Sequence, residues 1–409
     1  MRLIFGLVLA AAATVLHAEA PPKFRTDADG PVDVKPVKKG EGDAVPLDWF
    51  QLVEGEFPPE GSAHAISGEL IKVDHLERRF QLRVDRNDSQ QRGFWDLPVD
   101  AGMLPYGSIY YLGAPADLRD VPLGTHLHGL FYLADPNDDT PLPVGPNNRQ
   151  TPEAAFRRCF RLEDDFSLHV RQQQRWKIDK VDLATMKLTA TLHEKGEAKG
   201  EPKLFDLLTS TRVYEGGGFG DLQSLKAGQS VLFNLTWVTL YGPGRITDIW
   251  LDESSHQLAT AHQLERHRNH TRERGLPGWV TAVDDEAQIV TITFFGGVDP
   301  KLFDELTGID DEPFGWPLSK PEDDPKAPKG TIAVALASLM TYDPVNDRKG
   351  GNILDIKKIP VEPGSSGVQI KVKCDMLLEG FRPRRIVRFF PATWKVEALP
   401  REEQFFGRE

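Results

Sequence analysis

The sequence predicts a mainly β protein of 409 residues, built from three tandem small β-barrels joined by amphipathic helices. Three observations support this fold class. A hairpin pattern occurs three times with the same internal spacing, a second block of residues occurs twice, and two segments with helical spacing separate the units. Repeated patterns at a fixed period are typical of tandem structural units.

The hairpin pattern consists of Val-Asp, five further residues, and then three residues at alternate positions that can face a core. Asp favours a turn through its side chain, and alternation at period two is typical of a strand that buries one face. The copies start 108 and 102 residues apart. They are Val73-Asp74 with Phe80, Leu82 and Val84; Val181-Asp182 with Leu188, Ala190 and Leu192; and Val283-Asp284 with Val290, Ile292 and Phe294.

The second block is present in the first two copies and altered in the third. Residues 109–132 and 213–237 both read Tyr-x-x-Gly, then Asp-Leu, then Gly before an apolar strand. In the third copy the counterpart runs from Asp355-Ile356 through Gly364 to Val372, and an acidic, Pro-rich insertion at 310–329 interrupts the unit. The divergence marks the third unit as the place for a specialised role.

Each unit therefore has about five strands, with a short helical turn before the last. Closure into a small barrel removes exposed sheet edges at this size. The strand order is similar to that of Greek-key barrels of the oligonucleotide/oligosaccharide-binding (OB) type, and a two-sheet sandwich remains an alternative.

Helix signals place boundaries between the units. Thr151-Pro152 is a capping pair that predicts an amphipathic helix to about residue 172. A second helix is predicted from Ser254 or Ser255 to the stop signal at Gly275. The predicted organisation is a signal peptide at 1–20, a flexible linker at 21–60, barrel repeat 1 at 61–136, helix plus repeat 2 at 151–253, and helix plus repeat 3 at 254–400.

The N-terminus has the pattern of a cleavable secretory signal. Arg2 precedes an apolar run from Leu3 to Leu16, and Ala18-Glu19-Ala20 offers a cleavage site. The run is shorter than the ~20 apolar residues of a membrane span, so an uncleaved anchor is the weaker alternative. The sequence thus predicts export, to the periplasm or outside the cell, without an integral membrane span.

The net charge limits the possible partners, and the cysteine content limits the possible disulfides. The net charge of −12 argues against nucleic acid, because non-specific binding to phosphates depends on Lys and Arg. The two cysteines, Cys159 and Cys374, either form one disulfide, as export permits, or pack as two buried thiols. The sequence leaves both possibilities open.

His126-x-His128 is the candidate metal site. Period two places both rings on one face of a strand, close enough to share an ion. A third ligand has to come from His64, His75 or a carboxylate that folding brings near. The competing interpretation is a solvated or partner-facing strand edge.

The remaining polar clusters point to structural roles. His256, His262, His267 and His270 lie on the second predicted helix among arginines, which predicts a pH-responsive face. Asp74, Asp182 and Asp284 are predicted turn residues, without a catalytic role. Aromatic clusters could stack on sugars or peptides; they comprise Phe94, Trp95, Tyr106, Tyr110 and Tyr111, then Trp237, Tyr241 and Trp250, and finally Phe314 and Trp316.

The Val-Asp hairpin is similar to that of the small barrels of periplasmic metal carriers. The Met and Trp ligands of those carriers have no matching positions here, and no cofactor motif is found in the sequence. The main prediction is an exported, non-catalytic binding or assembly protein with a protein, glycan or cell-envelope partner. The alternative is an exported metal-binding protein or metal-dependent enzyme that uses His126 and His128.

Overall fold

The computed structural model describes residues 52, 55–58, 63–85, 98–132, 158–236, 244–306, 331–335, 348–374, 377, 379–391, 393–394 and 399–403. The predicted signal peptide at 1–20, most of the linker at 21–60 and the insertion at 310–329 lie outside these residues. So do six of the aromatic candidates, namely Phe94, Trp95, Trp237, Tyr241, Phe314 and Trp316.

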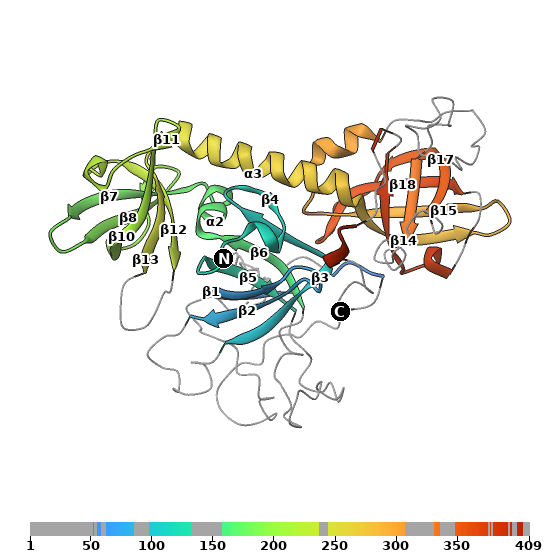
Figure 1. Cartoon of the computed structure of the whole chain (residues 1–409), viewed down its shortest axis with the longest axis horizontal. Helices are drawn as coiled ribbons and strands as arrows, with labels where there is room; N and C mark the ends of the chain where they lie inside the picture. Colours follow the sequence, from blue (N-terminus) through green and yellow to red (C-terminus); the bar gives the residue numbers. More distant parts are fainter. Residues whose placement is uncertain are drawn as a thin grey trace, which may run out of the picture.

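The first unit is a closed barrel of five strands, in which β1, β2, β3, β6 and β5 pair in a ring. One pair, β3–β6, is parallel, as an OB-like order requires. Figure 1 shows this barrel at the centre of the molecule. Its elements are β1 (His64–Asp74), β2 (Arg79–Val84), β3 (Val99–Tyr111), β4 (Ala114–Ala116), η3 (Leu118–Asp120), β5 (His126–Phe131) and β6 (Cys159–Asp164).

The second unit repeats this ring with β7, β8, β10, β13 and β12, and its β10–β13 pair is again parallel. The strands are β7 (Gln174–Asp182), β8 (Lys187–Glu194), β9 (Glu197–Ala198), β10 (Lys203–Glu215), β11 (Gly218–Phe219), β12 (Ser230–Thr236) and β13 (Arg245–Trp250), with η4 (Leu222–Ser224) before β12.

The third unit is a closed barrel of six strands rather than five, in the order β14-β15-β18-β17-β16-β19. All its pairs are antiparallel. Two strands, β17 and β16, stand between β18 and β19, where the first unit has the single strand β6 parallel to β3. Its elements are β14 (Leu276–Asp284), β15 (Ile289–Phe295), η5 (Pro300–Glu305), β16 (Thr331–Ala335), β17 (Arg348–Lys358), β18 (Ser365–Cys374), η6 (Glu379–Phe381) and β19 (Ile386–Phe390), followed by η7 (Arg401–Glu403).

The three Val-Asp hairpins have the same geometry. Each first strand has a bulge at the same position and pairs Val73, Val181 or Val283 with the first alternating residue. Backbone N–H groups of the turn donate to the carboxylates of Asp74, Asp182 and Asp284. The residue four positions after each Asp has a positive φ, at Arg78, Met186 and Gln288. The three aspartates therefore shape turns, as their position predicted.

The segment after residue 157 differs from the prediction. Residues 159–164, expected within a helix that opens the second unit, form strand β6 and complete the first barrel by pairing with β3 and β5. The helix α2 (Asp165–Arg171) is only seven residues long. Tertiary pairing overrides the helical spacing here, because an unpaired edge of β3 and β5 would otherwise remain.

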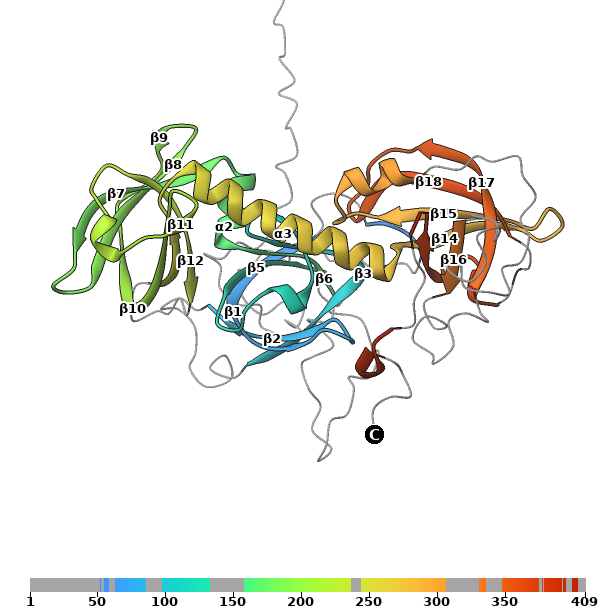
Figure 2. The ribbon, with the colours of Figure 1, turned by 45° about the horizontal axis from the view of Figure 1, so that its top comes forward.

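The second helix, α3 (Glu253–Arg274), begins and ends as predicted, with Gly275 following it. It runs from the second barrel to the third across the first (Figures 1 and 2). Its buried side chains are polar, and they are Ser255, His256, Gln263, His267 and Thr271. Hydrogen bonds and ion pairs, more than apolar burial, therefore hold this helix in place.

The contacts of α3 reach all three barrels. Thr260 Oγ1 donates to the carbonyl of Leu112 over 2.7 Å, and Arg266 pairs with Asp120 over 2.9 Å, both in the first barrel. In the third barrel Arg268 pairs with Asp299 and Arg272 with Glu305. On the second barrel, Asp252 and Ser255 at the start of α3 accept the backbone N–H groups of Gly216 and Gly217.

The start of α2 is held by the same kind of contact with the first barrel. Asp164 caps α2 by accepting the N–H of Ser167, and Asp164 and Ser167 accept the N–H groups of Leu112 and Gly113. The two Tyr-x-x-Gly segments of the sequence therefore form the turns that donate hydrogen bonds to the N-termini of α2 and α3.

Each barrel has its own apolar core. Phe80, Leu127 and Leu162 are fully buried in the first, Ile178 and Phe233 in the second. Cys159 belongs to the first core and Cys374 to the third, so the two buried thiols are not joined to each other. Among the described residues, none of the helices is both long and apolar enough to cross a membrane.

We expect Gly275→Ala to destabilise the third barrel. Gly275 has φ of +77°, and an added Cβ would lie 2.7 Å from the ring of Phe390. The positive φ alone costs about 1–2 kcal/mol for a residue with a Cβ, and the clash adds to it. Gly196→Ala is the matched control, because its φ is +92° and an added Cβ meets nothing within 4 Å. Equal losses in urea denaturation would contradict the packing argument.

Candidate metal centre

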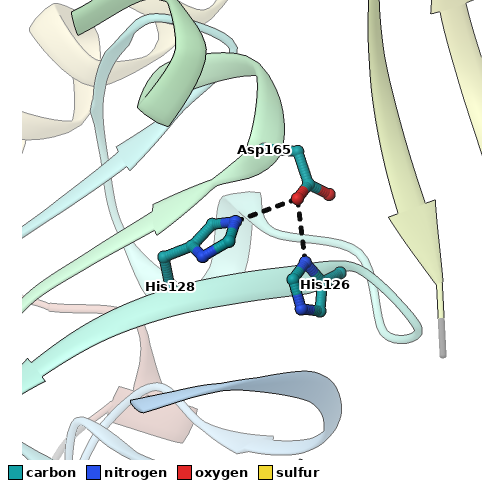
Figure 3. Close-up of side chains that lie close together, drawn as sticks. All are labelled: His126, His128 and Asp165. Atoms are coloured by element: carbon teal, nitrogen blue, oxygen red, sulfur yellow. Dashed lines mark hydrogen bonds and ion pairs between the residues drawn. The ribbon is translucent and has the colours of Figure 1, made fainter. Parts of the chain in front are cut away.

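His126 and His128 lie side by side on β5, as the alternation predicted. Their ring centroids are 4.7 Å apart and their planes nearly perpendicular. His126 is 3% exposed, and the His128 side chain is partly buried. Both rings turn toward the same side of the strand, where a carboxylate stands between them (Figure 3).

That carboxylate belongs to Asp165, the first residue of α2. One oxygen of Asp165, Oδ1, lies 2.8 Å from Nδ1 of His126 and 2.9 Å from Nε2 of His128. The position follows from the chain path, because β6 pairs with β5 and delivers its C-terminal end beside the two histidines. Asp165 is 3% exposed, so all three side chains meet away from bulk solvent.

Each imidazole is oriented by a polar contact at the ring nitrogen that is remote from Asp165. Nε2 of His126 lies 2.7 Å from the carboxylate of Asp85, which follows β2. Nδ1 of His128 lies 2.8 Å from the hydroxyl of Ser67, which is directly opposite His128 in the β1–β5 ladder. These partners occupy the remote nitrogens and leave the near ones facing Asp165. Such outer partners fix the tautomer and orientation of metal-binding histidines.

The second oxygen of Asp165 contacts the neighbouring barrel. Oδ2 accepts the backbone N–H of Leu235 on β12 over 2.9 Å. Beside it, Asn234 donates to Asp164 over 2.8 Å and accepts the N–H of Phe166 over 2.9 Å. The candidate site therefore lies at the boundary of the first and second barrels, with Asp165 bonded to both.

Opposing effects act on the ionisation of the cluster. Burial alone lowers the pKa of His126, but the adjacent carboxylates of Asp165 and Asp85 outweigh it and raise this pKa well above its usual value. Burial would raise the pKa of Asp165, but the two histidines hold it well below its usual range. His126 is thus an imidazolium that donates from both nitrogens, between two carboxylates.

The same donor atoms can hold a metal ion. One ligand atom from each of His126, His128 and Asp165 lies within 4.8 Å of the other two. Tetrahedral ligands with bonds of about 2.0–2.1 Å stand about 3.3 Å apart, so small shifts of these side chains would surround an ion. Two imidazoles and a carboxylate suit divalent first-row transition metals such as Zn²⁺. An ion would replace the Nδ1 proton of His126 and leave the bond to Asp85 intact.

The third ligand was anticipated only as an unspecified carboxylate. His75 lies in the first hairpin turn and lines a different cavity, and the side chain of His64 is outside the described residues. Asp165 was missed because residues 151–172 were expected to form one helix. The acidic run Glu163-Asp164-Asp165 before Ser167 is a helix-start signal that could have indicated the break.

The histidines of α3 do not form a comparable cluster within the described part of the chain. His256 is buried near the second barrel and His267 near the third, and burial lowers the pKa of each. His270 pairs with Asp117 over 3.1 Å. The three rings therefore have separate partners, at three different places along α3.

Several described aromatic candidates are core residues, but some border a groove between the second barrel and α3. Tyr214 stacks on Trp250, and Phe219 packs against Tyr214. Phe219 is 81% exposed and Leu258, on the opposite wall, is 39% exposed. The Gly-rich segment 216–220 contains β11 and the tight turn that joins it to β10, and it borders this groove.

Comparisons with known proteins give no family assignment. No family model matches the chain, and no curated protein matches it. Among solved structures, silver-bound CusF from Escherichia coli shares 17% identity over 20% of this chain and 90% of that chain, with a TM-score of 0.14. A copper(II)-bound variant of the Escherichia coli protein gives 16% identity over the same shares, with a TM-score of 0.15.

A buried histidine beside the site provides a pH prediction. Nδ1 of His169 donates to Gln174, and its Nε2 accepts the indole N–H of Trp176, so the ring is neutral. Burial lowers the pKa of His169 to about 4, against about 6.5 in an unfolded chain. Below pH 6.5 the unfolded chain therefore binds a proton at His169 that the folded chain does not bind. The free energy of unfolding consequently falls as the pH decreases toward 4.

Lowering the pH from about 7 to 5 should therefore reduce the free energy of unfolding by about 2 kcal/mol through His169. Urea denaturation of His169→Gln should show a correspondingly smaller pH dependence than the parent chain. His193→Gln, on the surface of β8, should keep the parent dependence. Identical pH profiles for His169→Gln and the parent would refute a neutral, buried His169.

Proposed function

We propose that this chain is an exported metal-binding protein whose ion lies at the boundary of the first and second barrels. The observation that carries the proposal is the convergence of His126, His128 and Asp165, within 4.8 Å, from two separate elements. The signal-like N-terminus supports export. Export and metal binding are both parts of the proposal.

Two features distinguish this cluster from a chance contact of polar side chains. The histidines are held from behind by Asp85 and Ser67, which leaves one nitrogen of each available to a common ligand. The cluster is also buried and faces no arginine or lysine in the contacts described above, so a divalent cation meets carboxylates and imidazoles. A bound ion would link β5 to α2, and through Asp165 to β12.

Metal content is the direct test. The parent chain, loaded with Zn²⁺ and passed through a desalting column, should retain about one ion per chain. The double variant His126→Ala/His128→Ala should retain none, while His193→Ala/His262→Ala, which removes two histidines elsewhere, should retain the ion. Circular dichroism should show that both variants are folded. A folded parent chain that retains no metal would contradict the proposal.

A subtler variant tests the orienting contact. Asp85→Asn keeps all three ligands but weakens the hold on the remote nitrogen of His126. Outer partners of this kind change metal affinity by about 10–100-fold, so competition with a chromogenic chelator should show a loss in this range. An unchanged affinity would mean that Asp85 does not orient a ligand.

The aromatic groove favours a second candidate function, attachment to a protein partner. Phe219 projects from the β10–β11 turn at 81% exposure, opposite Leu258 of α3. Exposed aromatic side chains beside an apolar groove are typical of protein-binding sites. We propose that this groove receives an apolar segment of a cell-envelope protein.

Phe219→Ser should abolish chemical crosslinking to that envelope protein without changing metal content. Val361→Ser provides the control, because Val361 is 75% exposed on the third barrel, away from the groove. If the parent chain, Phe219→Ser and Val361→Ser all give the same crosslinked product, the groove is not the attachment site.

A further inference from the structure

A second cavity lies between the first barrel, the C-terminal half of α3 and the third barrel. The first barrel contributes Arg78, Ser108 and Asp117 to its walls, α3 contributes His267, His270, Thr271 and Arg274, and the third barrel contributes Gly297 and Arg388. Glu403, near the C-terminus, also lines the cavity. The cavity shares no residue with the candidate metal centre.

The lining carries an excess of positive charge within an acidic chain. Four arginines line the cavity, at positions 78, 119, 274 and 388, against two carboxylates, Asp117 and Glu403. Both carboxylates are already engaged, because Arg274 pairs with Glu403 over 2.7 Å and His270 with Asp117 over 3.1 Å. The guanidinium groups of Arg78 and Arg388 have no ion-pair partner among the described residues.

Neutral groups alone bind these two guanidinium groups. Arg78 donates to the carbonyl oxygens of Leu104, Pro105 and Gly107, over 2.7–3.0 Å. Arg388 has one long bond, 3.4 Å, to the carbonyl of Gly275. Burial lowers the pKa of Arg78. Burial, followed by repulsion from Arg78, lowers the pKa of Arg388 to about 10. An anion between them would relieve this repulsion.

The cavity wall also holds buried N–H donors without an acceptor. Nε of Arg388 has no hydrogen-bond partner among the described atoms. Nε2 of His267 accepts the backbone N–H of Asp299, so the neutral ring carries its proton on Nδ1. That Nδ1 is also buried without a partner. Leaving a buried donor unsatisfied costs about 1–3 kcal/mol, which an anionic acceptor would recover.

We propose that this cavity binds a small oxyanion, held by Arg388 and Arg78 with His267 as a neutral donor. Carboxylate and phosphate groups present the paired oxygens that guanidinium groups bind most strongly. Three structural units enclose the cavity, which favours a small anion over a polymer. Bound there, the anion would join the first and third barrels.

The test is isothermal titration of the full chain with inorganic phosphate and, separately, with acetate, at constant ionic strength. Saturable binding of either probe is expected, and the probe that binds identifies the oxyanion as phosphate-like or carboxylate-like. Arg388→Gln should lower the affinity at least tenfold. Arg382→Gln removes the same charge from an exposed pair with Asp285 in the same barrel and should bind as the parent does.

Absence of binding by both probes overturns the proposal, as does equal affinity of the parent and Arg388→Gln. If Arg388→Gln fails to fold, Arg388→Lys replaces it, because lysine keeps the charge but lacks the paired N–H donors that bind an oxyanion. An unchanged affinity of Arg388→Lys then overturns the proposal, and a weakened affinity supports it. Metal content should be unaffected in every variant, so this result is independent of the metal site.

Discussion

The carboxylate of Asp165 is the contact on which the arrangement of the first two barrels depends. One oxygen binds His126 and His128 of the first barrel, and the other accepts a backbone N–H from β12 of the second. Buried charges are stable only when they are paired and hydrogen-bonded. The same requirement that fixes the barrel boundary therefore assembles three donors suited to a metal ion.

The third barrel is attached in a different way. Polar contacts of α3, such as Arg268 with Asp299 and Arg272 with Glu305, connect it to the rest of the chain. An aromatic cluster of Tyr106 from the first barrel with Trp279 and Phe295 from the third also joins these two barrels. The positive cavity around Arg388 lies at the same boundary. The all-antiparallel ring of the third barrel also separates it from the other two. Its divergence was visible in the sequence, but the added strands were not.

Local features of the fold were predictable from the sequence and non-local ones were not. The Val73-Asp74 hairpin and its counterparts depend on a turn residue and on alternation within a few positions. The limits of α3 follow from its cap and from Gly275. Strand β6 was mistaken for helix, because Cys159, Phe160 and Phe166 fall near helical spacing and the pairing of β6 with distant β3 leaves no local pattern.

The candidate site divides in the same way. His126 and His128 share a face because of strand periodicity, which a sequence reveals. Asp165 joins them only because β6 pairs with β5, and Asp85 and Ser67 because of barrel register. A site drawn from three strands and a helix start therefore cannot be specified from spacing alone, although its histidine pair can.

X-ray absorption spectroscopy of the Zn²⁺-loaded chain tests the central claim most directly. The proposal predicts a shell of nitrogen and oxygen ligands at about 2.0–2.1 Å, with outer scattering from two imidazoles. Those imidazole signals should disappear in His126→Ala/His128→Ala. A shell of water oxygens without imidazole, or one containing sulfur from Cys159 or Cys374, would contradict a metal centre at the barrel boundary.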